Sequence, residues 1–142
     1  MANLAVGVQA DFTGVLYTNG GWNKQPAWTF SPPSLPAHNG NNKITWTLTS
    51  IAVPSDYSAA FQATNGIQFK PSPPWPGSTP TRQPDGTVTA NDNFQNQGAT
   101  QTFGYTTAVV LTPNAGTNGA SGTFSIDPDV VNESGVVKVT VK

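Results

Sequence analysis

One stretch of the sequence decides the fold class: KITWTLTSI, residues 43–51. Within it Ile44, Trp46 and Leu48 are apolar, and threonines stand between them. Successive side chains of a β-strand point to opposite faces, so this alternation predicts a half-buried antiparallel strand with Trp46 in the core. The 3.6-residue period of an amphipathic helix is hard to find anywhere in the chain. The sequence therefore favours an all-β protein.

The same alternation of apolar and polar residues recurs on both sides of this stretch. It predicts a strand near each end of the chain, at Leu4–Val8 and Val137–Val141. The other strands that we expect lie at Thr13–Tyr17, Ala27–Phe30, Ala59–Ala63, Ile67–Phe69, Thr87–Ala90, Thr102–Leu111 and Thr123–Ile126. No linker or internal repeat divides these runs, so residues 1–142 are expected to form one domain.

Turn residues separate the runs and indicate how the strands connect. Asn65-Gly66 is predicted to form a tight hairpin with positive φ at both residues. Many short strands without helices between them predict an immunoglobulin-like antiparallel β-sandwich with Greek-key connections. The proline-rich segment 70–80 cannot be a central strand, because each proline removes a hydrogen-bond donor from the ladder.

Composition excludes several classes of function. Charged residues make up 9% of the chain and the formal net charge is -1, without a basic patch, so neither nucleic acid nor a membrane is an expected partner. The absence of cysteine excludes disulfides, thiolate metal sites and cysteine nucleophiles. No signal peptide is recognisable, so a cytoplasmic location is the default, although the Thr- and Asn-rich composition is also typical of exported β-domains.

The residues that could carry catalysis or bind a metal are few. His38 is the only histidine and stands in a turn, where we interpret it as an exposed loop residue. Asp127 and Glu133 could form the acid pair of a hydrolase. With Asp129 and Asn132 they also offer oxygen ligands for calcium, but not at the spacing of an EF-hand. We interpret the Asp127–Glu133 segment as a structural turn, and we expect neither catalysis nor a cofactor.

Tryptophans are the strongest candidates for ligand contacts. Trp22 lies in a Gly-rich turn and Trp75 among prolines, both predicted to be loops. Aromatic faces beside amide groups suit sugar rings, so a carbohydrate-binding module that uses Trp22 and Trp75 is one hypothesis. The Pro73–Pro76 stretch could also dock as a polyproline II ligand in another protein.

The C-terminal motif carries a resemblance to a known family. Residues 127–134 read DPDVVNES, and this segment follows the strands that contain Trp46 and Tyr105. It resembles the DP-EP family of small, β-rich bacterial proteins, named for an Asp-Pro and a later Glu-Pro. Asp127-Pro128 matches the first pair, whereas Glu133 is followed by Ser134. The resemblance implies a fold and no particular activity.

The leading hypothesis is a non-catalytic binding or self-assembly domain that acts through its surface. So few charges leave strand edges unprotected against pairing with other chains. The Val-rich strand at Val136–Val141 has Lys138 as its only internal charge, and we expect it to pair with a second copy. The alternatives are the carbohydrate-binding module and the hydrolase.

Overall fold

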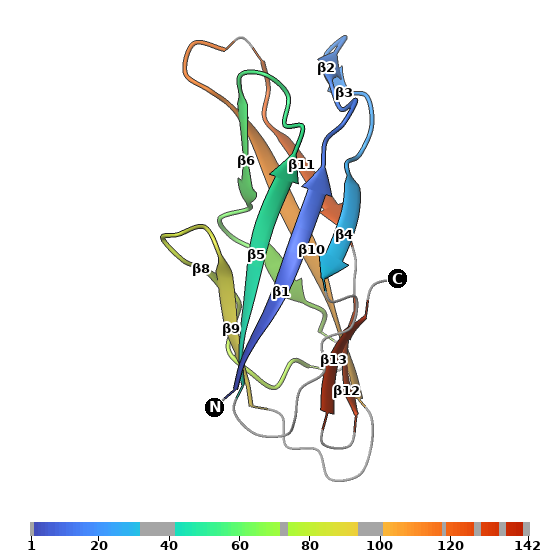
Figure 1. Cartoon of the computed structure of the whole chain (residues 1–142), viewed down its shortest axis with the longest axis vertical. Coiled ribbons are helices and arrows are strands. Elements are labelled where there is room, and N and C mark those ends of the chain that lie inside the picture. Colours follow the sequence, from blue (N-terminus) through green and yellow to red (C-terminus); the bar gives the residue numbers. More distant parts are fainter. Residues whose placement is uncertain are drawn as a thin grey trace.

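The computed structural model describes residues 2–31, 42–71, 74–93, 101–117, 119–126, 129–133 and 136–140. For residues 2, 101–102, 129–133 and 136–140 it describes the backbone only. Every regular element in these ranges is a strand (Figure 1). The strands are β1 (Ala2–Asp11), β2 (Tyr17–Thr18), β3 (Gly21–Trp22), β4 (Ala27–Ser31), β5 (Asn42–Ile51), β6 (Tyr57–Phe61), β7 (Ile67–Phe69), β8 (Thr81–Arg82), β9 (Val88–Asp92), β10 (Gln101–Pro113), β11 (Gly122–Ile126), β12 (Asp129–Glu133) and β13 (Val136–Thr140). No helix in the described ranges could cross a membrane.

The first sheet has five strands in the order β4-β1-β5-β9-β8. The prediction of an antiparallel strand at residues 43–51 is right for one neighbour and wrong for the other. β5 runs antiparallel to β9 but parallel to β1, from Ala2 beside Asn42 to Asp11 beside Ile51. The parallel pairing arises because β4 returns antiparallel along β1, and the chain then starts β5 on the far side of β1.

The second sheet is built around β10. β6 and β11 pair with overlapping stretches of this long strand and therefore lie along its opposite edges. β7 and β12 pair with its N-terminal half, and β13 adds to β12. In Figure 1 β10 and β11 pass behind the first sheet. The molecule is thus all-β, with one mixed and one antiparallel sheet of several strands each.

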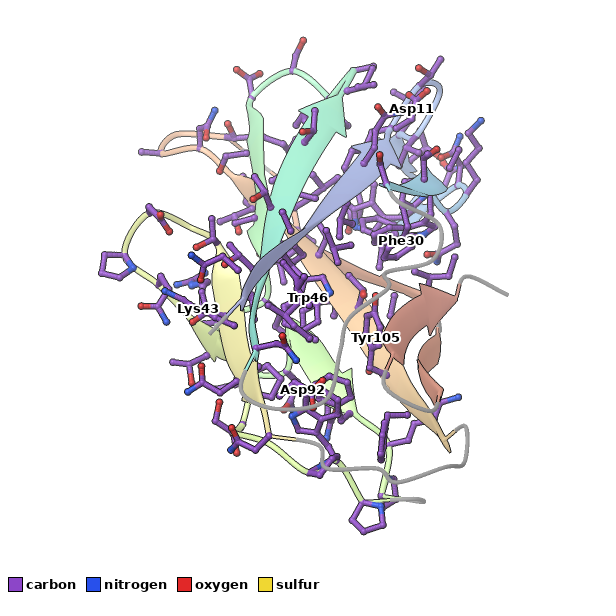
Figure 2. All side chains as sticks on the ribbon, turned by 60° about the horizontal axis from the view of Figure 1, so that its bottom comes forward. Asp11, Phe30, Lys43, Trp46, Asp92 and Tyr105 are labelled. Atoms are coloured by element: carbon purple, nitrogen blue, oxygen red, sulfur yellow. The ribbon has the colours of Figure 1, made fainter. Side chains whose placement is uncertain are left out.

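The two sheets share one hydrophobic core. Its fully buried aromatic residues come from both sheets and from the turn after β1: Phe12, Trp46, Phe61, Phe103, Tyr105 and Phe124. The Trp46 and Tyr105 rings lie 5.8 Å apart, and the indole Nε1 donates to the Tyr105 hydroxyl at 3.4 Å (Figure 2). The prediction that Trp46 lies in the core is confirmed, because its side chain is 0% exposed.

The strand predicted at Thr13–Tyr17 is wrong, because the chain turns there. The Asp11 carboxylate accepts hydrogen bonds from the Thr13 backbone N–H at 2.9 Å and from its hydroxyl at 2.6 Å. Val15 N–H then donates to the Phe12 carbonyl. A side chain that bonds the backbone two residues on competes with the strand ladder, and β1 ends at Asp11.

The hairpin predicted at Asn65-Gly66 is also wrong. β6 and β7 pair with β10 and not with each other, and of the two turn residues only Asn65 has positive φ, 64°. Ala108 bonds both ends of the turn, donating to the Gly66 carbonyl and accepting from Gln62 N–H. Residues 63–65 therefore bulge out of an otherwise continuous edge. Gly66 is needed for close approach, since a Cβ there would lie 2.7 Å from the Gln62 carbonyl oxygen.

The C-terminal segment differs from the predicted turn. Residues 129–133 form β12, which pairs with both β10 and β13, so Asn132 and Glu133 belong to a strand. The β-branched pair Val130-Val131 explains this preference. The Val-rich strand is confirmed as β13. Asp127, Pro128 and His38 lie outside the described residues.

Candidate functional site

A groove with a volume of about 660 Å³ lies between β7, an edge strand of the second sheet, and β8, an edge strand of the first sheet. One wall is the bulge at 63–65 and β7, from the second sheet. The other is the segment 74–80 and β8, the last strand of the first sheet. Its volume is within the range of about 300–1,000 Å³ that is typical of ligand pockets.

Backbone hydrogen bonds hold the segment 74–80 against β9, but the segment does not form a strand of the sheet. Ser78 N–H donates to the Asn91 carbonyl at 2.9 Å, and Asn93 N–H donates to the Pro76 carbonyl at 3.0 Å. Gly77 forms an isolated bridge with Asp92, and a Cβ at Gly77 would overlap the Asn91 carbonyl oxygen. The prediction that this proline-rich segment is no central strand holds for the residues described.

Trp75 forms a fixed part of the groove wall. Its ring stacks on Phe69 with centroids 3.7 Å apart and planes 5° apart, and it meets the Phe103 ring edge-on at 5.5 Å. The indole Nε1 donates to the Ser78 carbonyl at 3.1 Å. Because ring and nitrogen are both held, Trp75 offers a ligand a surface that is already in place.

The two charged side chains in the described lining of the groove are both cations. Lys70 follows β7 directly, and Arg82 comes from β8. Arg82 Nη1 donates to the Phe61 carbonyl at 3.1 Å, so the guanidinium bridges the two sheets. A guanidinium has five N–H donors, which leaves others for a ligand. Of the residues that the structure describes, no Asp, Glu or His lines the groove.

The other predicted ligand residue, Trp22, lies in a separate aromatic cluster. Its ring packs edge-on against Tyr17, Tyr57 and Phe124, at centroid distances of 5.4, 5.2 and 5.6 Å. Its Nε1 is buried and has no hydrogen-bond partner among the described residues. The structure therefore does not bring Trp22 and Trp75 together, and whether either one binds a ligand stays a prediction.

The predicted acidic residues cannot be assembled into a site from the described part of the chain. Asp129 and Glu133 stand at the two ends of β12, whose side chains are not described. In the described ranges no group of three His, Cys, Asp or Glu side chains could hold a metal ion. The hydrolase and calcium hypotheses therefore stay predictions.

Sequence reasoning missed Asp92, a carboxylate that is 0% exposed. Its backbone lies opposite that of Asn42, which is also buried, and forms a β-bridge with Gly77, which lines the groove. A signal for it existed, because Val88 and Ala90 face the core and alternation puts residue 92 on the same face.

Comparison with known proteins adds no relative. The sequence matches no protein-family model and no curated protein. The resemblance to the DP-EP family therefore stays a prediction, and the candidate site rests on its own geometry.

Proposed function

We propose that this chain is a non-catalytic, immunoglobulin-like β-sandwich that acts by binding, and that its ligand lies in the groove between β7 and β8. The observation that carries the proposal is the groove itself, with its volume of about 660 Å³ and the fixed Trp75 ring in its wall. Ligand pockets combine such apolar, aromatic walls with a few placed polar groups.

The immunoglobulin-like assignment is supported by the path of the chain. It passes from the first sheet to the second after β5, back after β7 and over again after β9. These crossings place the pair β6 and β7 on the second sheet and the next pair, β8 and β9, on the first, and such alternation is typical of Greek-key sandwiches. The buried Trp46 between the sheets agrees with that architecture.

The residues of the groove favour binding over catalysis. General acids and bases are most often His, Glu or Asp, and none of these is among the described residues that line the groove. Lys70 and Arg82 supply positive charge, and Phe69 and Trp75 supply apolar surface. Such a set orients and holds a ligand.

A carbohydrate is the second candidate ligand, favoured by Trp75 in the groove wall. Trp22 would take no part in the same site, because it belongs to the other aromatic cluster. Self-assembly is a further mode of binding. β13 pairs only with β12 among the described strands, so its outer edge is available to a second copy.

A blocked groove tests the proposal. Thr64 is an exposed residue in the groove wall, and Thr29 is an exposed residue on β4, outside the groove. We would screen wild type, Thr64→Trp and Thr29→Trp against a displayed peptide library and a glycan array. The expected result is a ligand that wild type and Thr29→Trp bind and Thr64→Trp loses. If no ligand is found, or if Thr64→Trp binds every ligand as well as wild type does, the groove is not the site.

A further inference from the structure

The free backbone of β7 is the feature of the groove that points to a particular kind of ligand. Along β10, Gly66 accepts from Ala108 N–H at 2.9 Å and Lys70 N–H donates to the Gly104 carbonyl at 2.7 Å. In an antiparallel ladder alternate residues bond to the same neighbour, so the residues between them direct N–H and C=O away from it. The amides and carbonyls of Ile67 and Phe69 therefore point away from β10.

This free edge lies in the groove. Ile67 and Phe69 both line it, and β7 pairs with no described strand except β10. The facing strand, β8, is likewise the last of its sheet. Unpaired N–H and C=O groups in a row are a template for an added strand.

The charge of the groove narrows the class of ligand. Lys70 stands directly after β7, and the Arg82 guanidinium is held at the Phe61 carbonyl, before the bulge that precedes β7. The cations thus flank the free edge on both sides, and no carboxylate is found in the described lining of the groove. An added strand that carries carboxylates would complement both the free edge of β7 and the positive charge of the groove.

From these observations we infer that the groove binds an extended, acidic segment of another protein, which adds to the second sheet as a strand beside β7. The inference rests on the proposed function and names its ligand class. Backbone hydrogen bonds with Ile67 and Phe69 hold the segment, and Lys70 and Arg82 select its carboxylates.

A second copy of this chain fits the same groove poorly. The strands that end a sheet or flank β10 on one side have no Asp or Glu, namely β2, β3, β4, β6, β7, β8, β11 and β13. The strands that carry acidic residues, β1, β9 and β12, are each paired on both sides. No described strand could therefore offer both a free edge and a carboxylate.

The test uses the peptide Glu-Val-Thr-Val-Glu amide with a fluorophore on its N-terminus, and fluorescence polarisation. We expect it to bind wild type and Thr29→Trp, to bind Arg82→Gln about tenfold or more weakly, and to lose binding to Thr64→Trp. The matched peptide with Lys in place of both Glu residues should not bind. Added salt should weaken binding, because the attraction is between charges near the surface.

Backbone methylation identifies a strand. Two versions of the acidic peptide would carry N-methyl groups on alternate peptide nitrogens, one on the odd-numbered and one on the even-numbered residues. In only one of the two versions would the methylated nitrogens face β7. We expect the version methylated on the side facing β7 to lose binding and the other version to bind as the unmethylated peptide does. Equal effects of both sets, or equal binding of the Lys peptide, would overturn the inference.

The failure of this inference can be told from failure of the proposed function. A glycan that binds wild type and not Thr64→Trp, with no peptide bound, overturns the acidic strand and keeps the groove. A dimer that Thr64→Trp breaks, seen by sedimentation, would likewise overturn it and assign the groove to a second copy. If the screen finds no ligand for the wild-type chain, both the acidic-strand inference and the proposed function are overturned.

Discussion

Trp46 holds the two sheets together at the scale of one residue. Its ring contacts Tyr105 and Phe69 of the second sheet and is fully buried. We expect Trp46→Ala to lower the free energy of unfolding by about 3–5 kcal/mol, because it leaves a large cavity. The matched variants at the three other tryptophans, which are partly exposed, should cost less. Chemical denaturation measures all four, and similar midpoints would contradict this account of the core.

Gly122 makes room for the ring of Trp22. A Cβ at Gly122 would lie 2.7 Å from Cε2 and 2.9 Å from Cδ1 of that indole. The ring is enclosed by other aromatic residues, so we expect Gly122→Ala to destabilise by about 1–3 kcal/mol. Gly21→Ala is the control, because nothing lies within 4 Å of a Cβ there. Unfolding midpoints that are lowered equally by both variants would contradict the close contact.

Two aspartates each accept hydrogen bonds from the threonine two residues later. The Thr87 hydroxyl at 2.7 Å and then its backbone N–H at 3.0 Å hold the pKa of Asp85 below its usual range, and Thr13 does the same for Asp11. A lowered folded-state pKa gives stability that is present above the unfolded value, about 3.9, and is lost as pH falls through the folded value. We expect Thr87→Val to raise the pKa of Asp85 and leave that of Asp11. Carboxyl titration by NMR checks this, and an unchanged Asp85 would contradict it.

At the scale of elements, alternation in the sequence predicts that a strand exists but not which strand lies beside it. The strand Ile67–Phe69 has the bounds that the sequence predicts. The strands that contain Trp46 and Tyr105 differ from their predicted bounds by one or two residues at an end. The parallel pairing of β1 with β5 could not be predicted, because it depends on the path of the intervening chain. The turn at Asp11 was missed because a side-chain hydrogen bond outweighs the tendency to extend.

The bulge between β6 and β7 shows the same limit for turn motifs. Asn-Gly is the usual signal of a hairpin, yet here both flanking strands pair with β10. The pair Asn65-Gly66 satisfies a local requirement, with positive φ at Asn65 and close packing at Gly66. Local chemistry therefore marks where the chain bends, while the long β10 decides what the bent strands join.

At the scale of the whole molecule, the groove exists because edges of two sheets meet. The sequence singles out Trp75 as a ligand residue, and Trp75 lines the groove. It gives no sign that β7 and β8 face each other, since that depends on the crossing of the chain between sheets. The sequence hypothesis also places Trp22 in the same binding site as Trp75. In the fold the two rings belong to different aromatic clusters.

The central claim is that the groove between β7 and β8 is the binding site, and amide chemical-shift mapping tests it most directly. A ¹⁵N-labelled chain would be titrated with the acidic peptide, or with whichever ligand the screen yields. We expect shifts confined to residues 63–71 and 74–82, largest at the Ile67 and Phe69 amides, which face the groove. Shifts centred on Trp22 and Tyr57, or along β13, would contradict the claim.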